Sequence, residues 1–232
     1  MHMKSIHVPD SSWKISSLFH ELQEVSGEAA SQFHASGPDL EKYGLMWVVV
    51  RYELNFKKTP VPGDRLLIQT WALPFRHKLS QRNYVLSDKD GNAVITAAGV
   101  WAIVDRCTRN MVEPEQFPIH LPEEKNEIMI SRPAAPNKLD TSYSDEYIVI
   151  ESDLDTNLHM NNTRYFDLAE DRINRLINGN MHLKQVRAAY LTEARMGERI
   201  HLDWAYKDGS AYCHGQKSGS ECFQIGFSYN IM

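Results

Sequence analysis

The chain has 232 residues, 42% of them hydrophobic, which suffices for one large domain or for two of roughly 100–120 residues, each with a core. No apolar run approaches the ~20 residues of a transmembrane helix, and the start has no signal-peptide-type stretch, so we expect a cytoplasmic protein without membrane insertion. A net charge of −5 argues against a nucleic-acid partner, and three cysteines without a CxxC pair argue against a disulfide framework or zinc ribbon.

The first predicted element is a helix over residues 16–34, where Leu18, Leu22, Val25, Ala29 and Phe33 recur at helical spacing. Strand-forming residues follow, and a Pro-, Asn- and Ser-rich linker comes next. A second helix over residues 161–179 carries Tyr165, Leu168, Ala169, Ile173 and Leu176, with Asn161 or Asn162 as its cap and Gly179 at its end. The predicted strands are 47–56, 64–73, 81–88 and 93–105 before the linker, and 185–193, 198–206, 211–216 and 221–230 after the second helix.

The two halves resemble each other. "PGDRLLIQTWAL" aligns with "MGERIHLDWAY", and "DGNAVITAAGVW" aligns with "SGSECFQIGFSY". We therefore predict an α+β protein in which a long helix followed by an antiparallel sheet occurs twice. The expected boundaries are 1–130 for the first domain, 131–145 for the linker and 146–232 for the second domain.

The stretch "DLDTNLHMNNTRY", which begins at Asp153, concentrates polar residues before the second helix. It fits the first three ligand positions of an EF-hand, but Leu158 and Arg164 stand where that loop needs Gly and Glu. His159 has no second His at zinc-ligand spacing, so we expect no metal. Asx-turns and helix capping explain Asp153 and the Asn pair. An extended segment would also place Asp155, Asn157 and His159 on one side, and the motif alone leaves capping and function equally open.

Glu193 is the second polar residue of interest. In the predicted strand "QVRAAYLTE", alternation puts it on the same side as Ala189 and Leu191, where a carboxylate is costly unless it has partners. The alternative is a Glu at the strand end that bends into water. When Gly63 is aligned with Gly197, Glu193 corresponds to Thr59, and the first half also lacks the D-x-N-x-H motif. This asymmetry predicts one active site per chain.

These motifs carry a family resemblance that covers nearly the whole chain. "DLDTNLHMNNTRYFDLA" resembles the D-x-N-x-H-V-N-N-x-x-Y helix entry of the acyl-ACP thioesterases of bacteria and plant plastids. "AAYLTEA" is similar to the segment that carries their catalytic Glu, and "GVWAIVDRCTRNMV" closes the first sheet as in that family. The resemblance implies a tandem hot-dog fold. One departure is Ala194, because many plant members have Cys there, and a Cys nucleophile at this site is excluded.

The resemblance implies a catalytic network of Asp155, Asn157, His159 and Glu193. Glu193 would activate a water as general base, although the sequence leaves open whether Glu193 or His159 takes the proton. Amides around Asn161 and Asn162 would stabilise the oxyanion. The first domain would form the acyl pocket, and its wall candidates serve equally well as ordinary core: Phe33, Met46, Trp47 and Val49.

The implied partner is an acidic acyl carrier protein (ACP) carrying a fatty-acyl chain, and no cofactor is expected. Basic segments could steer it: Lys57-Lys58, Arg76-His77-Lys78, and Arg106 with Arg109. Three alternatives stay open, namely an acyl-CoA thioesterase, a hot-dog dehydratase or hydratase, and a non-catalytic acyl-binding module. Chain-length preference and a possible homodimer are not decided by the sequence.

Overall fold

The computed structural model describes residues 1–9, 14–119, 121, 128–177 and 182–230. The chain divides into two compact units. Unit 1 contains residues 1–13 and 20–133, and unit 2 contains residues 14–19 and 134–232. Among the described residues, no helix is both long enough and apolar enough to cross a membrane.

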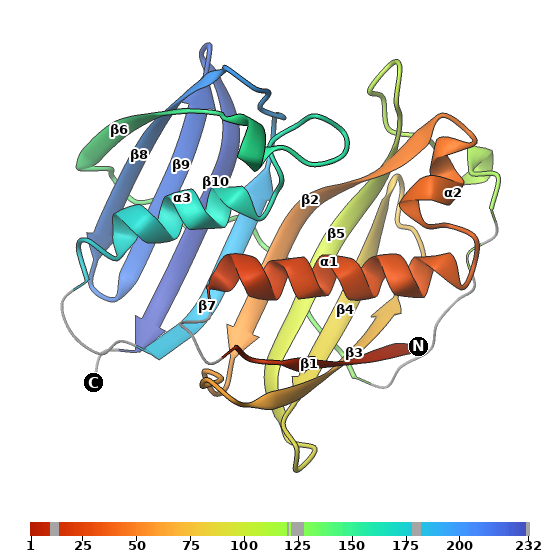
Figure 1. Cartoon of the computed structure of the whole chain (residues 1–232), viewed down its shortest axis with the longest axis horizontal. Helices are drawn as coiled ribbons and strands as arrows, with labels where there is room; N and C mark the ends of the chain where they lie inside the picture. The colour runs from red at the N-terminus through yellow and green to blue at the C-terminus, as the bar shows by residue number, and fades with distance from the viewer. Residues whose placement is uncertain (10–13, 120, 122–127, 178–181, 231–232) are drawn as a thin grey trace. The chain divides into compact units, whose positions relative to one another are not determined.

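Unit 1 is an antiparallel sheet with the strand order β1-β3-β4-β5-β2 (Figure 1). Residues 20–31 of helix α1 belong to this unit and run across one face of its sheet, where Leu22 and Val25 are fully buried, whereas residues 15–19 of the same helix belong to unit 2. The predicted spacing is confirmed for Leu18, Leu22, Val25 and Ala29, whereas Phe33 lies beyond the helix, which ends at Ser31. The elements are β1 (His2–His7), α1 (Ile15–Ser31), α2 (Gly37–Glu41), β2 (Leu45–Phe56), β3 (Arg65–Ala72), β4 (Leu79–Ser87), β5 (Ala93–Asp105) and the 3-10 helix η1 (Pro114–Gln116).

Unit 2 repeats this arrangement with the strand order β7-β10-β9-β8-β6, and α3 packs on β8, β9 and β10. Strand by strand, β6 to β10 take the places of β1 to β5, which confirms the predicted duplication. The elements are β6 (Tyr143–Ile148), the 3-10 helix η2 (Glu151–Asp153), α3 (Arg164–Ile173), β7 (His182–Tyr190), β8 (Arg199–Lys207), β9 (Ser210–Lys217) and β10 (Ser220–Asn230).

The repeat extends to hydrogen bonds in the turn that precedes β3 and β8. Gly63 and Gly197 both have positive φ, 86° and 79°. In unit 1 the Val61 N–H donates to the Asp64 carboxylate at 3.0 Å, and in unit 2 the Arg195 N–H donates to the Glu198 carboxylate at 2.7 Å. A left-handed glycine and an acidic cap are the local signals that fix this turn in both halves.

The prediction that each half begins with a helix was wrong. The strands β1 and β6 precede the helices and pair antiparallel with β3 and β8. The strand β6 also begins at Tyr143, inside the stretch predicted as a linker. Five of its six residues are exposed, so it lacks the apolar alternation by which a strand is recognised in sequence.

The second helix is shorter than predicted. It begins at Arg164 after Thr163 and ends at Ile173, so Leu176 lies in the turn that follows. Gly179, the predicted end, lies outside the described residues. Tyr165, Leu168 and Ala169 are buried as expected. The Asn161 side chain accepts the Thr163 N–H at 2.9 Å, so this Asn supports the helix entry from two residues before the cap position.

Gly215 on β9 is a position where the packing leaves no space for a side chain. A Cβ there would meet the Phe223 ring and would come within 2.8 Å of Ile200 Cγ2. We expect Gly215→Ala to reduce the free energy of unfolding by about 2 kcal/mol, because overpacking displaces buried neighbours. Urea denaturation measures it. Gly27→Ala is the matched control, because Gly27 lies within α1 with open space at its Cβ, and it should stabilise by up to ~1 kcal/mol.

Candidate active site

The segment 153–161 forms a small hairpin rather than an extended strand. Leu154 and Met160 form an antiparallel bridge, and the Asp155 N–H donates to the His159 carbonyl at 2.8 Å. The Asp155 carboxylate turns inward and accepts the N–H groups of Asn157 at 2.8 Å and of His159 at 3.4 Å. Of the two alternatives that the motif left open, the extended segment with Asp155, Asn157 and His159 on one side is therefore wrong, because local Asx hydrogen bonds close the loop.

His159 on this hairpin contacts Glu193, which lies in the segment after β7. The His159 Nε2 lies 3.1 Å from the Glu193 Oε2, and the exposed fractions of the two side chains are 9% and 38%. A hydrogen bond of 2.8 Å from the Met160 N–H to the Ala194 carbonyl holds the two segments side by side. An imidazole that contacts a half-exposed carboxylate is a pair that can move a proton to or from a water molecule.

The backbone that carries Glu193 is not the strand that the sequence predicted. The strand β7 ends at Tyr190, so alternation does not extend to Glu193, and Leu191 is 53% exposed instead of lying on an apolar side. The N–H groups of Leu191 and Thr192 both donate to the Cys222 carbonyl, at 2.8 and 3.2 Å, as the chain leaves the ladder. The segment after β7, and not the pleat of the strand, directs Glu193 towards His159.

The two amides predicted to stabilise an oxyanion differ in their hydrogen bonding. The Asn161 N–H donates to the Asp153 carbonyl at 2.8 Å, so it is not available for an oxyanion. Within the described part of the chain, the Asn162 N–H has no hydrogen-bond partner, and the Asn162 carbonyl accepts the Tyr190 O–H at 3.3 Å. Of the two predicted amides, that of Asn162 remains the candidate. The Asn157 side chain is exposed on the hairpin, where an incoming substrate can reach it.

The four candidate pocket residues in unit 1 do not share a face. Trp47 and Val49 point to the same side of β2, and the Trp47 Nε1 donates to the Ala35 carbonyl at 2.8 Å. The Trp47 ring packs on Phe75 with a centroid distance of 6.3 Å. Met46 points to the opposite side by alternation, so it does not line the same surface as Trp47. Phe33 is half-buried in the turn after α1.

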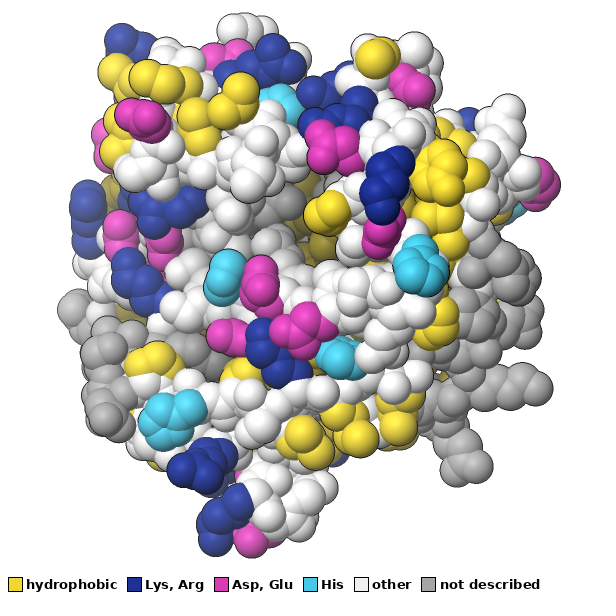
Figure 2. All heavy atoms as spheres, turned by 45° about the vertical axis from the view of Figure 1, so that its right-hand side comes forward, with side chains coloured by type: hydrophobic (Ala, Val, Ile, Leu, Met, Phe, Trp, Pro, Cys, Tyr) yellow, Lys and Arg dark blue, Asp and Glu magenta, His cyan; other side chains and the backbone are white. Residues whose placement is uncertain are grey.

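The basic segments are partly neutralised by neighbouring carboxylates. Lys78 lies 2.9 Å from Glu113, and Arg106 lies 3.1 Å from Glu41. Figure 2 shows Lys and Arg side chains scattered among acidic ones over the described part of the face that it draws. On this face an acidic partner would therefore contact individual basic side chains and not a continuous basic patch.

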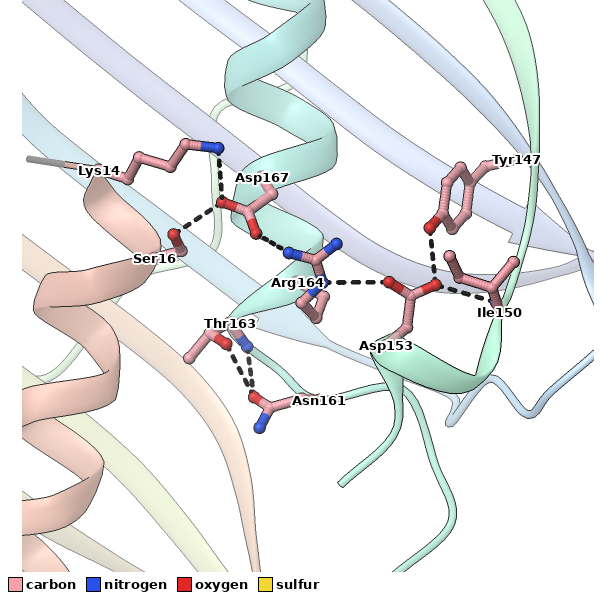
Figure 3. Close-up of polar contacts among 9 residues, drawn as sticks. All are labelled: Lys14, Ser16, Tyr147, Ile150, Asp153, Asn161, Thr163, Arg164 and Asp167. Carbon is pink, nitrogen blue, oxygen red and sulfur yellow. Dashed lines mark hydrogen bonds and ion pairs between the residues drawn. The ribbon is translucent and has the colours of Figure 1, made fainter. Parts of the chain in front are cut away.

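Two residues contact the base of the hairpin although the sequence did not point to them. Tyr147 and Arg164 both donate to the carboxylate of Asp153, a residue that is completely buried (Figure 3). The sequence offered capping as the role of Asp153. No spacing rule links it to Tyr147 on β6 or to an Arg eleven positions later.

Comparison with known proteins identifies both units. Residues 7–116 match the model of the acyl-ACP thioesterase N-terminal domain, and residues 137–227 match that of the C-terminal domain. The chain belongs to the acyl-ACP thioesterase family. Its Asp155, Asn157, His159 and Glu193 therefore lie within the matched C-terminal domain.

Individual family members agree with this assignment. A chloroplastic palmitoyl-acyl carrier protein thioesterase of Gossypium hirsutum is 28% identical over an alignment of 180 positions, and the match covers 67% of this chain and 41% of that protein. A chloroplastic oleoyl-acyl carrier protein thioesterase of Coriandrum sativum is 23% identical over an alignment of 206 positions, and the match covers 78% of this chain and 54% of that protein. The chain thus spans about half the length of the curated relatives it matches.

Solved structures show the same fold. An acyl-ACP thioesterase from Bacteroides thetaiotaomicron has a TM-score of 0.81 at 18% identity and covers 98% of this chain and 97% of its own. The 12:0-ACP thioesterase from Umbellularia californica has a TM-score of 0.79 at 19% identity, with coverages of 98% and 96%. The predicted tandem hot-dog fold is confirmed.

Proposed function

We propose that the protein hydrolyses the thioester of a fatty-acyl ACP, which yields a free fatty acid and ACP with its thiol restored. The observation that carries this proposal is the contact of 3.1 Å between the His159 Nε2 and the Glu193 Oε2, within the matched C-terminal domain of the family. Hydrolysis needs a water molecule, a group that accepts its proton and a hydrogen-bond donor for the oxyanion. Glu193 is the candidate for the proton acceptor, and the Asn162 N–H is the candidate for the donor.

In the proposed reaction, the oxygen of a water molecule attacks the thioester carbonyl carbon while Glu193 takes the proton. Its exposed fraction of 38%, against 9% for His159, supports Glu193 as the group that meets water and His159 as its partner. The Asn162 N–H would stabilise the oxyanion. The C–S bond then breaks, and the proton passes to the thiolate that leaves. Asp155 acts through the backbone of the hairpin, and the exposed Asn157 would orient the thioester.

We propose that the two domains divide the work, with residues 146–232 carrying the chemistry and residues 1–130 holding the acyl chain. Trp47 and Val49 are the wall candidates supported by their shared face on β2, and Phe33 is a third. Met46 points to the other side of β2, so it could line only a pocket on that side of the sheet. If Trp47 limits the pocket, Trp47→Ala should shift the preferred acyl length upwards in an assay with a panel of chain lengths.

The test of the function is the release of free thiol from a panel of acyl-ACPs and the matching acyl-CoAs. Turnover of the ACP esters with higher kcat/KM than the CoA esters supports the proposal, whereas a preference for CoA supports an acyl-CoA thioesterase. Binding without cleavage supports an acyl-binding module, and addition of water to an enoyl thioester supports a hydratase. The acidic ACP as partner, the cytoplasmic location and a homodimer remain predictions, and sedimentation of the pure protein tests the last.

A further inference from the structure

Asp153 is a buried carboxylate that the proposed chemistry does not use. Its exposed fraction is 0%, and it accepts three hydrogen bonds. The Tyr147 O–H donates at 2.6 Å, the Ile150 N–H at 3.0 Å and the Arg164 Nε at 3.1 Å (Figure 3). Burial of a charge is costly unless it is paired and hydrogen-bonded, so this carboxylate and Arg164 depend on each other.

Arg164 continues the network into two helices. Its Nη1 donates to Asp167 on α3, one turn along the same helix. The other oxygen of Asp167 accepts the Ser16 hydroxyl at 2.7 Å and lies 3.6 Å from the Lys14 ammonium (Figure 3). All these residues belong to unit 2, so the network ties the start of α1, the first turn of α3 and the end of β6 to one carboxylate.

This carboxylate stands at the base of the hairpin that carries His159. The Asp153 carbonyl accepts the Asn161 N–H at 2.8 Å, which closes the base, and the bridge between Leu154 and Met160 comes directly above it. His159 follows on the second arm. Its partner Glu193 comes from a separate segment, so the direction of the hairpin determines whether the His159 Nε2 and the Glu193 Oε2 meet.

We propose that Asp153 and Arg164 are positioning residues, which fix the hairpin so that His159 stays in contact with Glu193. The expected effect on kcat rests on the function proposed above. The contact between His159 and Glu193 can be measured without substrate. Misplacement of a reacting group by about 1 Å can cost on the order of 10²-fold in rate, so a positioning defect is visible in kcat.

The informative variants are Asp153→Asn, Arg164→Met and Arg164→Lys. We expect Asp153→Asn and Arg164→Met each to lower kcat about 30- to 100-fold with KM changed less than about threefold. The double variant should be no worse than the poorer single one, because both remove the same link. Arg164→Lys keeps the charge and should recover part of the loss. If Asp153→Asn does not fold, Tyr147→Phe removes one of its donors and should give a smaller loss in the same direction.

The readout that separates positioning from simple stability is the 15N NMR signal of the His159 imidazole, which reports tautomer and hydrogen bonding. Glu193→Gln gives the reference for a disturbed contact, and Asp153→Asn and Arg164→Met should move the signal in folded protein. Asp145→Asn is the matched control, since it breaks the pair of 3.0 Å with Arg172 on α3 away from the hairpin. It should leave the signal and kcat unchanged.

The outcomes are distinct. If the imidazole signal and kcat stay at wild-type values in folded Asp153→Asn and Arg164→Met, the proposal is wrong. If the wild type cleaves no thioester but both variants move the signal, the proposed function fails and the positioning role stands.

Discussion

Glu193→Gln is expected to lower kcat for thioester hydrolysis about 10³-fold while KM changes less than about threefold. The amide has the shape of the carboxylate and can still contact the His159 imidazole, but it cannot accept a proton from water. General-base catalysis contributes typically 10²- to 10⁴-fold, which sets the expected size of the loss. Steady-state release of thiol from the preferred acyl-ACP measures it.

A second substitution assigns the proton acceptor. If Glu193 is the base, His159→Ala should cost less than Glu193→Gln, because the carboxylate keeps its chemistry and loses only its partner. If His159 is the base, the order reverses. The double variant should resemble the worse single variant, since groups that act as a unit are not additive.

The matched control for this experiment is Glu151→Gln, which removes an exposed carboxylate from η2 near the hairpin. It should keep kcat within about twofold, in line with the small effects of ordinary surface substitutions. Wild-type kcat in Glu193→Gln would rule out Glu193 as the base. Equal losses in Glu151→Gln and Glu193→Gln would indicate a general effect of charge.

The fold was predictable where local chemistry decides it. The alternation in β3 and β8 and the glycines at 63 and 197 gave both the strands and the duplication. The hairpin turns at Asp208-Gly209 and Ser218-Gly219 have positive φ at both residues, the geometry for which Gly and Asp or Ser are suited. The edge strands β1 and β6 were not predictable, because their polar sequences become strands only by pairing with β3 and β8.

The residues of the candidate site could be selected from the sequence, but their geometry could not. The polar motif and Glu193 could both be singled out, but Glu193 was placed on a strand, and the motif was left open between a capping loop and an extended segment. The structure instead uses an Asx turn at Asp155 and a segment beyond the end of β7. Both departures come from hydrogen bonds that override side-chain alternation. The anchoring of Asp153 by Tyr147 and Arg164 joins separate elements, so no local pattern announces it.

Glu170 on α3 gives rise to the second large effect, on stability rather than on catalysis. Its Oε2 accepts the Ile15 N–H at 3.2 Å, at the start of α1. Burial raises the pKa of Glu170 from 4.5 to about 7, the Asp167 and Asp171 carboxylates add to this rise, and the Ile15 N–H and Lys14 oppose it. The folded protein therefore keeps a proton that the unfolded chain releases between pH 4.5 and about 7.

Because the folded state binds more protons in this range, the free energy of unfolding falls as the pH rises from 4.5 to about 7, and it stays lower above that. The difference between the two pKa values corresponds to about 3 kcal/mol. Glu170→Gln removes the charge and retains an oxygen that can accept the Ile15 N–H. It should stabilise the protein by about 2–3 kcal/mol near pH 8 and by little near pH 4.5, as measured by urea denaturation at both values.

Glu24→Gln, which removes an exposed carboxylate from α1, is the control and should change the free energy of unfolding equally little at both pH values. A stabilisation by Glu170→Gln of the same size at low and high pH would mean that packing, and not ionisation, is responsible. A loss of stability near pH 8 would mean that the charge of Glu170 at the start of α1 outweighs its cost of burial. The carboxylate would then act as a favourable cap on the helix dipole.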